Sequence, residues 1–211
     1  MHYSLVMVGA HDGTKAHKLI TRSAAAGKVL LIEPVPFLFR RLTARYADCP
    51  AIGLRDHAIA ASDGEVEFTA PKETANSLAT WGDQLGSLVA SHAVAHHPGF
   101  AEHIEVITVK ARSFATLLDA ENISTIELLF TDTEGMDAEL LPTFPFSRTT
   151  PNRIIFEFKH ADGFMRVGPK LARLLDFLDG CGYRISVLDS ENMIATHRSV
   201  TTRVPISNFL G

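Results

Sequence analysis

Short apolar runs alternate with amphipathic stretches at the start of the chain. The runs that end at Val8 and Ile32 are almost unbroken, as is typical of strands buried on both faces. Between them, Thr14 is positioned as an N-cap and Gly27 as a left-handed C-cap. The pattern predicts strands over 4–8 and 29–32 and helices over 14–26 and 37–47. This order is typical of parallel βαβ units.

The middle of the chain has a different character. Ile52 to Ala60 predicts a third strand, and alternation over 65–69 predicts a half-exposed strand after a turn at 62–64. Residues 71–103 lack clean periodicity, apart from a weak helical pattern over 84–95. An irregular stretch this long predicts a lid-like insertion.

Regular patterning returns at Ile104 and continues to the C-terminus. It predicts strands over 105–110, 126–131 and 153–158, helices over 113–121, 136–141 and 169–179, and a terminal hairpin of 183–188 with 192–196. The whole chain, 1–211, is therefore expected to be a single α/β domain. Its fold should be a doubly wound, Rossmann-like sheet of seven mostly parallel strands, with an antiparallel C-terminal strand from the hairpin.

Composition narrows the class of protein. The chain has 211 residues, enough for one well-buried domain. Its net charge of −4 is unlike that of proteins that neutralise nucleic-acid phosphates. Cys49 and Cys181 stand far apart with no CxxC pair, as expected for reduced thiols in a cytoplasmic protein. No stretch approaches the roughly 18–20 apolar residues that span a bilayer. We therefore expect neither a nucleic-acid nor a membrane partner.

Chemically competent residues follow the predicted strands, at the edge where doubly wound sheets bind ligands. They are Gly9 to Gly13, Glu33, Asp132-Thr133-Glu134 and Glu157 to His160, with His57-Ala58 near the end of the third strand. Two glycines allow a close approach of backbone to a ligand. A carboxylate at the end of the second strand can accept hydrogen bonds from ribose hydroxyls. Together the glycine loop and Glu33 predict a nucleoside site.

The glycine loop reads GAHDG rather than GxGxxG. A bulky polar pair, His11-Asp12, stands where a pyrophosphate requires close backbone approach. This disfavours NAD and suits a nucleoside that carries an amino-acid tail.

The chain resembles the FkbM family of class I methyltransferases. The resemblance covers roughly residues 5–197. It rests on the following segments in family order: Val8 to Thr14, Leu31 to Pro36 with Phe39 and Leu42, Ala58 to Ala60, Asp63 to Val66, Ser77-Leu78, Val109 to Leu118, Ile126 to Leu141 with Thr131-Asp132-Thr133-Glu134-Gly135-Met136-Asp137 at its core, and Ile154 to Glu157.

The resemblance implies S-adenosylmethionine as cofactor and a map of its contacts. Gly9, Ala10, His11, Asp12 and Gly13 would contact the methionine moiety, Glu33 with the adjoining Pro34 the ribose, and His57 and Ala58 the adenine. Asp132 would lie near the amino group and the sulfonium.

The expected reaction is methyl transfer to an oxygen of a small molecule or sugar. A hydroxyl acceptor requires a base, and the candidates are Asp132, Glu134 and His160. Glu157 would orient the acceptor, and Trp81 would form a platform for it.

Each of these residues also has a structural interpretation. Asp132 and Glu134 are positioned to cap the helix predicted near 136, His160 is placed as a surface histidine, and Trp81 as a packing residue of the lid. The histidines His92, His96, His97 and His103 have no clear carboxylate partner, so no metal site is expected.

Two other functions stay open from the sequence. One is an NAD-dependent oxidoreductase, against which the GAHDG loop and the terminal hairpin count. The other is a non-catalytic module that binds S-adenosylmethionine. The second is suggested by Thr131, where the family usually has lysine, and by His11, where it usually has a small polar residue.

Overall fold

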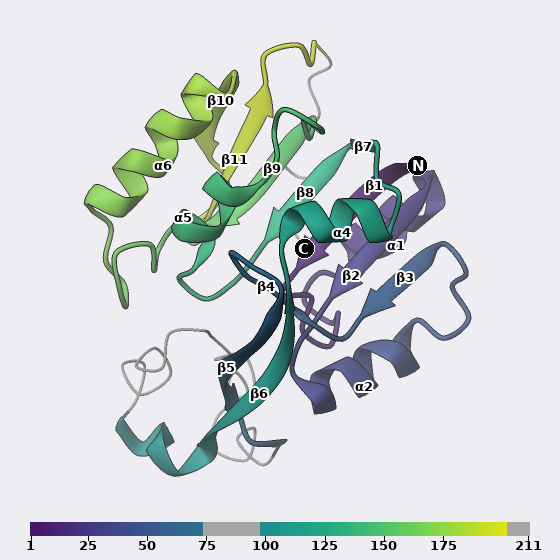
Figure 1. Ribbon diagram of the computed structural model, residues 1–211, viewed down its shortest axis with the longest axis vertical. Helices are drawn as coiled ribbons and strands as arrows, with labels where there is room; N and C mark the ends of the chain where they lie inside the picture. The colour runs from purple at the N-terminus through teal and green to yellow at the C-terminus, as the bar shows by residue number, and fades with distance from the viewer. Residues whose placement is uncertain (74–97, 202–211) are drawn as a thin grey trace.

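The computed structural model describes residues 1–73 and 98–201. Its central sheet has the order β10-β11-β9-β8-β1-β2-β3, with β7 also paired to β1 (Figure 1). The strands are β1 (His2–Val8), β2 (Lys28–Ile32), β3 (Ile52–Arg55), β7 (Thr125–Ile126), β8 (Leu128–Thr131), β9 (Arg153–Glu157), β10 (Tyr183–Val187) and β11 (Asn192–His197). All neighbours are parallel except β11, which is antiparallel to both β9 and β10. The predicted doubly wound, mostly parallel α/β fold is confirmed.

The strand count differs slightly from the predicted seven. The single strand expected over 126–131 is two segments, β7 and β8, interrupted at Glu127. Both pair with β1 in the same register, since His2 lies opposite Thr125 and Val6 opposite Leu129. The sheet therefore has eight segments in seven positions.

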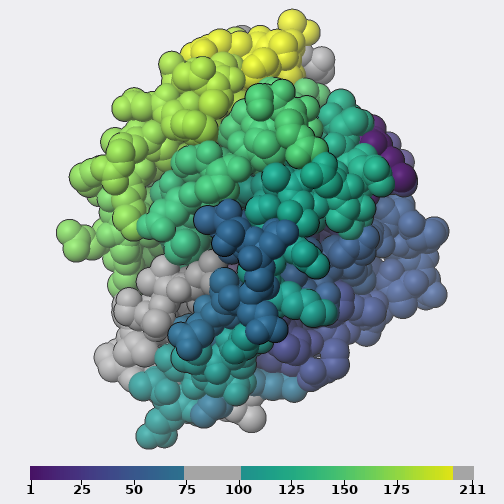
Figure 2. Space-filling view, in the orientation of Figure 1, coloured from purple at the N-terminus to yellow at the C-terminus, as the bar shows by residue number. Residues whose placement is uncertain are grey.

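The third predicted strand, 52–60, does not stay in one sheet. Its first part is β3, and its last part is β4 (Ala58–Ile59), which belongs to a separate sheet of order β4-β6-β5. In that sheet β5 (Gly64–Pro71) pairs antiparallel with β6 (Ile104–Arg112). Figure 1 shows the β5–β6 ribbon extending away from the central sheet, and Figure 2 shows its atoms, in blue and teal, gathered on one part of the surface. The change of sheet occurs at Asp56-His57, so His57 lies in the connection two residues beyond the end of β3 rather than inside one continuous strand.

Helices cover both faces of the central sheet. They are α1 (His17–Ala26), α2 (Pro36–Arg45), α4 (Phe114–Ala120), α5 (Asp137–Leu140) and α6 (Pro169–Gly180), with 3-10 turns η3 (Pro98–His103) and η4 (Leu141–Thr143). Alternate residues of β1 belong to opposite layers. Val6 packs in a cluster with Phe114 of α4 and Leu174 of α6. Met7 packs in a cluster with Ile20 of α1. This arrangement explains why β1 is apolar from Leu5 to Val8.

The first helix begins later than its sequence suggests. Helix α1 starts at His17, not Thr14, and its N-cap is Ala16. The side chain of Asp12 accepts hydrogen bonds from the N–H and the hydroxyl of Thr14, both at 2.8 Å. These bonds hold the residues before the helix in a turn, because a short polar side chain competes with helical hydrogen bonding.

Gly27 also differs from its prediction. Its φ of 167° is extended rather than left-handed. Glycine nevertheless fits there, because a Cβ would lie 2.4 Å from the hydroxyl oxygen of Ser4 unless that side chain rotated. The constraint is the close approach of β1 to the end of α1, which no local sequence signal reveals.

Three other expectations concern smaller features. Cys49 and Cys181 are free thiols, as predicted. None of the helices in residues 1–73 and 98–201 is long and apolar enough to cross a membrane. The weak helical pattern over 84–95 lies outside the described residues, as does most of the predicted insertion over 71–103.

The C-terminal part of the sheet is stabilised by a buried tyrosine. Tyr183 is fully buried, and its hydroxyl donates a hydrogen bond to the carbonyl oxygen of Pro151 at 2.7 Å. Tyr183→Phe should lower the free energy of unfolding by about 1 to 2 kcal/mol, because the carbonyl would lose its partner without regaining water. Urea denaturation measures this loss.

The control for this variant is Tyr3→Phe. Tyr3 is buried to a similar degree, and no hydrogen bond of its hydroxyl is found within the described part of the chain. Removing that hydroxyl should therefore leave stability nearly unchanged. Equal losses in the two variants would contradict the role given to the Tyr183 hydrogen bond.

Candidate functional site

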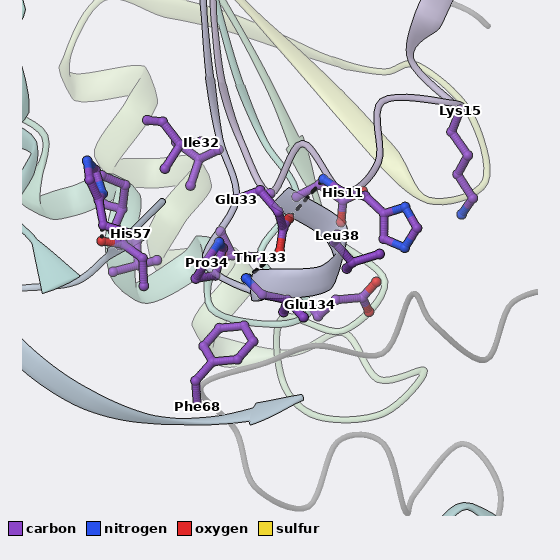
Figure 3. Close-up of a pocket in the computed structure, with 17 residues that line it drawn as sticks. His11, Lys15, Ile32, Glu33, Pro34, Leu38, His57, Phe68, Thr133 and Glu134 are labelled. Carbon is purple, nitrogen blue, oxygen red and sulfur yellow. Dashed lines mark hydrogen bonds between the residues drawn. The ribbon is translucent and has the colours of Figure 1, made fainter. Parts of the chain in front are cut away.

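The carboxyl ends of four adjacent parallel strands surround a cavity. In spatial order these strands are β9, β8, β1 and β2. Asp132 follows β8, Gly9 follows β1 and Glu33 follows β2, and all three line the cavity (Figure 3). About 730 Å³ of space that no atom fills lies within it, part of it open to solvent. The predicted ligand edge of the sheet is therefore hollowed.

Most residues predicted to bind the cofactor meet at this cavity. Those that line it are Gly9, His11, Glu33, Pro34, His57, Ala58 and Asp132. Glu134, predicted as a candidate base, lines it too. Trp81, predicted as a substrate platform, lies outside the described residues.

Three predicted cofactor residues do not line the cavity. Ala10 is buried in the core cluster that contains α1. Asp12 is turned toward Thr14 and Arg45, whose Nη2 lies 3.4 Å from its Oδ2. Gly13 packs against the ring of Tyr46, and a Cβ there would approach that ring to 2.7 Å. These three residues therefore contribute to the packing of the loop against α1 and α2 rather than to the cavity wall.

Gly9 fixes the relation between two strand ends. Its φ is 79°, and a Cβ at this position would lie 1.9 Å from the carbonyl oxygen of Asp132. The N–H of Asp132 donates to the carbonyl oxygen of Val8 at 3.0 Å, which extends the pairing of β1 with β8. The sequence suggested that Gly9 makes room for a ligand. The structure shows that it also makes room for the backbone of Asp132.

Glu33 is a buried carboxylate held in one orientation. It is 4% exposed. The N–H of His11 donates to Oε2 at 2.8 Å and the N–H of Val35 to Oε1 at 2.9 Å (Figure 3). Burial raises the pKa of Glu33, and the two N–H groups oppose that rise. A carboxylate oxygen has more than one acceptor position, so each oxygen of Glu33 retains the capacity to accept a bond from a ligand hydroxyl.

An apolar wall faces His57, and the sequence analysis did not identify most of it. Val35, Leu38, Ile59 and Phe68 line the cavity with His57. Burial lowers the pKa of His57, so its imidazole tends to be neutral. Alternation along β5 could have revealed the inward side of Phe68, but only contact between the two sheets brings Phe68 to the cavity. This wall can cover a flat, largely apolar ring.

Lys15 is a second residue that the sequence analysis did not select. It precedes α1, lines the cavity and points toward the region of His11 and Glu134 (Figure 3). Its charge acts to lower the pKa of both Asp132 and Glu134. The cavity therefore has one cationic side chain close to its carboxylates.

Asp132 and Glu134 bring carboxyl groups to the cavity wall. Burial, followed by the charges of Glu134 and Asp137, raises the pKa of Asp132. Burial also raises the pKa of Glu134, against the opposing charges of Lys159 and Lys15. The cavity thus has an electronegative end, opposite in character to the apolar wall.

The capping role considered for Asp132 and Glu134 is not observed. Helix α5 begins at Asp137, and its N-cap, Met136, makes no side-chain cap. Instead, buried Asp137 accepts hydrogen bonds from the N–H and the hydroxyl of Thr133, at 3.1 and 2.8 Å. Glu134 has a positive φ of 50°, which turns the chain between β8 and α5. Asp132 and Glu134 are therefore not needed to begin the helix.

Glu157 and His160 lie next to the cavity but do not line it. His160 is buried, not a surface residue as one interpretation of the sequence had it. Its Nδ1 accepts a hydrogen bond from the N–H of Met165 at 3.0 Å, and its ring stacks on Phe164. Its Nε2 lies 3.6 Å from Oε1 of Glu157. His160 is thus enclosed by its own loop and by Glu157, which disfavours it as the base that contacts an acceptor.

Comparison with known proteins places this geometry in a family. Residues 8–185 match the model of the methyltransferase FkbM domain. The chain belongs to the FkbM methyltransferase family. This membership agrees with the resemblance found in the sequence and decides against an NAD-dependent oxidoreductase. S-adenosylmethionine is the methyl donor of the family.

Solved methyltransferase structures are similar to this FkbM domain at low sequence identity. A precorrin-6y C5,15-methyltransferase from Geobacter metallireducens matches with 10% identity and a TM-score of 0.48, over 93% of this chain and 81% of the other. The Methanococcus jannaschii fibrillarin pre-rRNA processing protein matches with 13% identity and a TM-score of 0.47, over 93% of this chain and 66% of the other. Aeropyrum pernix fibrillarin, with natively bound S-adenosyl-L-methionine, matches with 10% identity and a TM-score of 0.41, over 92% of this chain and 65% of the other. The chain spans about two thirds of the two fibrillarins. A comparison with curated proteins gives no significant match.

Proposed function

We propose that this FkbM domain transfers the methyl group of S-adenosylmethionine to an oxygen of a small molecule or sugar. The proposal rests on one observation: the same cavity contains a buried carboxylate held in a fixed orientation and, on its wall, two further carboxyl groups. Glu33 accepts two backbone N–H bonds, and Asp132 and Glu134 lie on the wall of the same cavity.

Each part of the cofactor has a suitable partner among these residues. Glu33 suits the ribose hydroxyls, and the wall formed by His57 and Phe68 suits the adenine. The carboxyl group of Asp132 suits the positive end of the cofactor, and Lys15 its carboxylate. When bound, the cofactor supplies an activated methyl group on a sulfonium.

The chain's own contribution to the reaction is position and proton transfer. A cavity that aligns donor and acceptor can account for several kcal/mol of the barrier. For a hydroxyl acceptor, a carboxylate within hydrogen-bond reach must take the proton. Asp132 and Glu134 are the carboxylates that line the cavity, so we assign this step to one of them rather than to His160.

Calorimetry with S-adenosylhomocysteine and NAD tests the cofactor assignment. We expect micromolar binding of S-adenosylhomocysteine and no measurable binding of NAD, because the GAHDG loop provides no close approach for a pyrophosphate. Tight binding of NAD without binding of S-adenosylhomocysteine would contradict the proposal.

A screen of acceptors tests the oxygen assignment. Release of S-adenosylhomocysteine should rise with sugars or hydroxylated small molecules and stay at the acceptor-free rate with amines and carbon acids. Turnover with amines or carbon acids alone would contradict O-methylation. Cofactor binding without turnover on any acceptor would instead favour the non-catalytic module.

A further inference from the structure

Two carboxylates and one imidazole come together beside the cavity. Glu134 follows β8, and Glu157 and His160 lie at the end of β9, the parallel neighbour of β8. One ligand atom from each of the three lies within 4.8 Å of the other two. Two atoms bound to the same ion lie at most twice the bond length apart, about 4.2 Å for bonds near 2.1 Å. Small side-chain rotations would bring the three atoms to that spacing.

One oxygen of this group is buried without a hydrogen bond. The side chain of Glu157 is 4% exposed. Across residues 1–73 and 98–201, no hydrogen-bond partner of its Oε2 is found. A buried polar atom without a partner is rare in native proteins and calls for an explanation such as a bound ion.

The charges around Glu157 are mostly negative. Glu157 is buried, and the carboxyl groups of Asp132, Glu134 and Asp137 interact with it electrostatically. The ammonium of Lys159 lies 3.8 Å from Oε1 of Glu157 but only 2.6 Å from Glu191, which is its closer partner. Four carboxyl groups therefore crowd one end of the site, with Lys15 and Lys159 as the cations that act on them. This excess of carboxyl groups is a setting that favours a cation.

From these contacts we infer that Glu134, Glu157 and His160 bind a divalent cation of the Mn²⁺ and Mg²⁺ class. Carboxylate oxygens are the preferred ligands of both ions, and a single imidazole is compatible with Mn²⁺. Glu134 also lines the cavity, so the ion would lie beside the acceptor, where it can orient an acceptor oxygen and polarise it. That use of the ion rests on the proposed methyl transfer, but the binding of the ion does not.

The hydrogen bond of His160 adds a structural consequence. Met165 N–H donates to Nδ1 at 3.0 Å, so the proton of the neutral ring is on Nε2, the atom near Glu157. An ion on Nε2 moves that proton to Nδ1, and Met165 N–H loses its acceptor. Met165 is exposed and has a φ of 51°. The ion should therefore loosen the segment 161–167, and hydrogen exchange of the Met165 amide should become faster when Mn²⁺ is added.

Mn²⁺ binding to the whole chain, without cofactor, tests the site by electron paramagnetic resonance and calorimetry. The wild-type protein should bind one Mn²⁺. Glu157→Gln and His160→Gln should each weaken binding by more than about tenfold, since even changes to groups that orient metal ligands cost 10- to 100-fold. The matched control is Glu139→Gln, which removes an exposed carboxylate of α5 that is not part of the cluster and pairs with Lys170. It should leave the affinity for Mn²⁺ within about twofold.

Glu134→Gln tests the site even if the variants of the buried residues Glu157 and His160 do not fold. Glu134 is half-buried in a loop, so this change should be tolerated, and it should weaken Mn²⁺ binding as Glu157→Gln does. Thermal unfolding without metal verifies that each variant is folded.

Three outcomes would overturn the inference. They are no binding of Mn²⁺ or Mg²⁺ at millimolar concentration, binding that is equal in the wild type and the cluster variants, and binding that Glu139→Gln abolishes equally. Wild-type protein that binds S-adenosylhomocysteine but no Mn²⁺ refutes the ion site and leaves the proposed function intact. Protein that binds Mn²⁺ but not S-adenosylhomocysteine refutes the proposed function and leaves the ion site intact.

Discussion

Gly9→Ala is expected to destabilise the protein by about 4 kcal/mol or more, at the upper end of single-residue effects. The added Cβ would lie 1.9 Å from the carbonyl oxygen of Asp132, a backbone atom that cannot rotate away, and the residue would keep a φ of 79°. Relief requires β1 and β8 to move apart at the centre of the sheet. Since whole domains are stable by only about 5 to 15 kcal/mol, we expect a large fall in the urea midpoint and poor recovery of folded protein.

Gly163→Ala is the control that separates steric overlap from backbone strain. Gly163 has a φ of 113°, but a Cβ there would meet nothing within 4 Å. Gly163→Ala should therefore lower the free energy of unfolding only through backbone strain, by about 1 to 2 kcal/mol. If Gly9→Ala were no more destabilising than Gly163→Ala, the close approach of Asp132 to Gly9 would not be a constraint in solution.

Glu33→Ala should weaken the binding of S-adenosylhomocysteine by about 10- to 100-fold, as expected for loss of hydrogen bonds to a charged group. The variant also leaves the N–H groups of His11 and Val35 without their acceptor. Part of the loss could then come from a disordered loop rather than from the missing ribose contact.

A ligand that lacks the ribose hydroxyls separates these two causes. Wild-type protein should bind S-adenosylhomocysteine more tightly than its 2′,3′-dideoxy analogue, and Glu33→Ala should bind the two about equally. If the variant still discriminates between the ligands as the wild type does, Glu33 does not contact the ribose. Calorimetry at a temperature where both proteins are folded provides the measurement.

The sequence predicts the central sheet well because burial on both faces leaves a strong local signal. The runs Leu5 to Val8 in β1, Val29 to Ile32 in β2 and Ile154 to Phe156 in β9 are apolar, since helices cover both sides of them. The predictions are wrong where the local structure depends on contacts with residues far away in the sequence. The split between β3 and β4 depends on pairing with β6, and the extended Gly27 depends on the approach of Ser4.

The candidate site divides in the same way. Glu33 and Asp132 were predictable because each directly follows a parallel strand, and such ends meet at one edge. Phe68 was not, because it reaches the cavity through a second sheet. The cluster of Glu134, Glu157 and His160 was not predicted either. Glu134 lies in the loop after β8, Glu157 is the last residue of β9 and His160 lies in the loop that follows. The adjacency of β8 and β9 brings the three together.

The antiparallel strand β11 also has a consequence for synthesis of the chain. Although it follows β10 in sequence, it lies between β9 and β10 in the sheet. Until Asn192 to His197 have left the ribosome, β9 has one unpaired edge, and every residue of β9 is apolar or buried in the finished sheet. Exposed strand edges of this kind recruit other chains. Nascent chains that stall before β11 should therefore be the species most prone to aggregate or to engage chaperones.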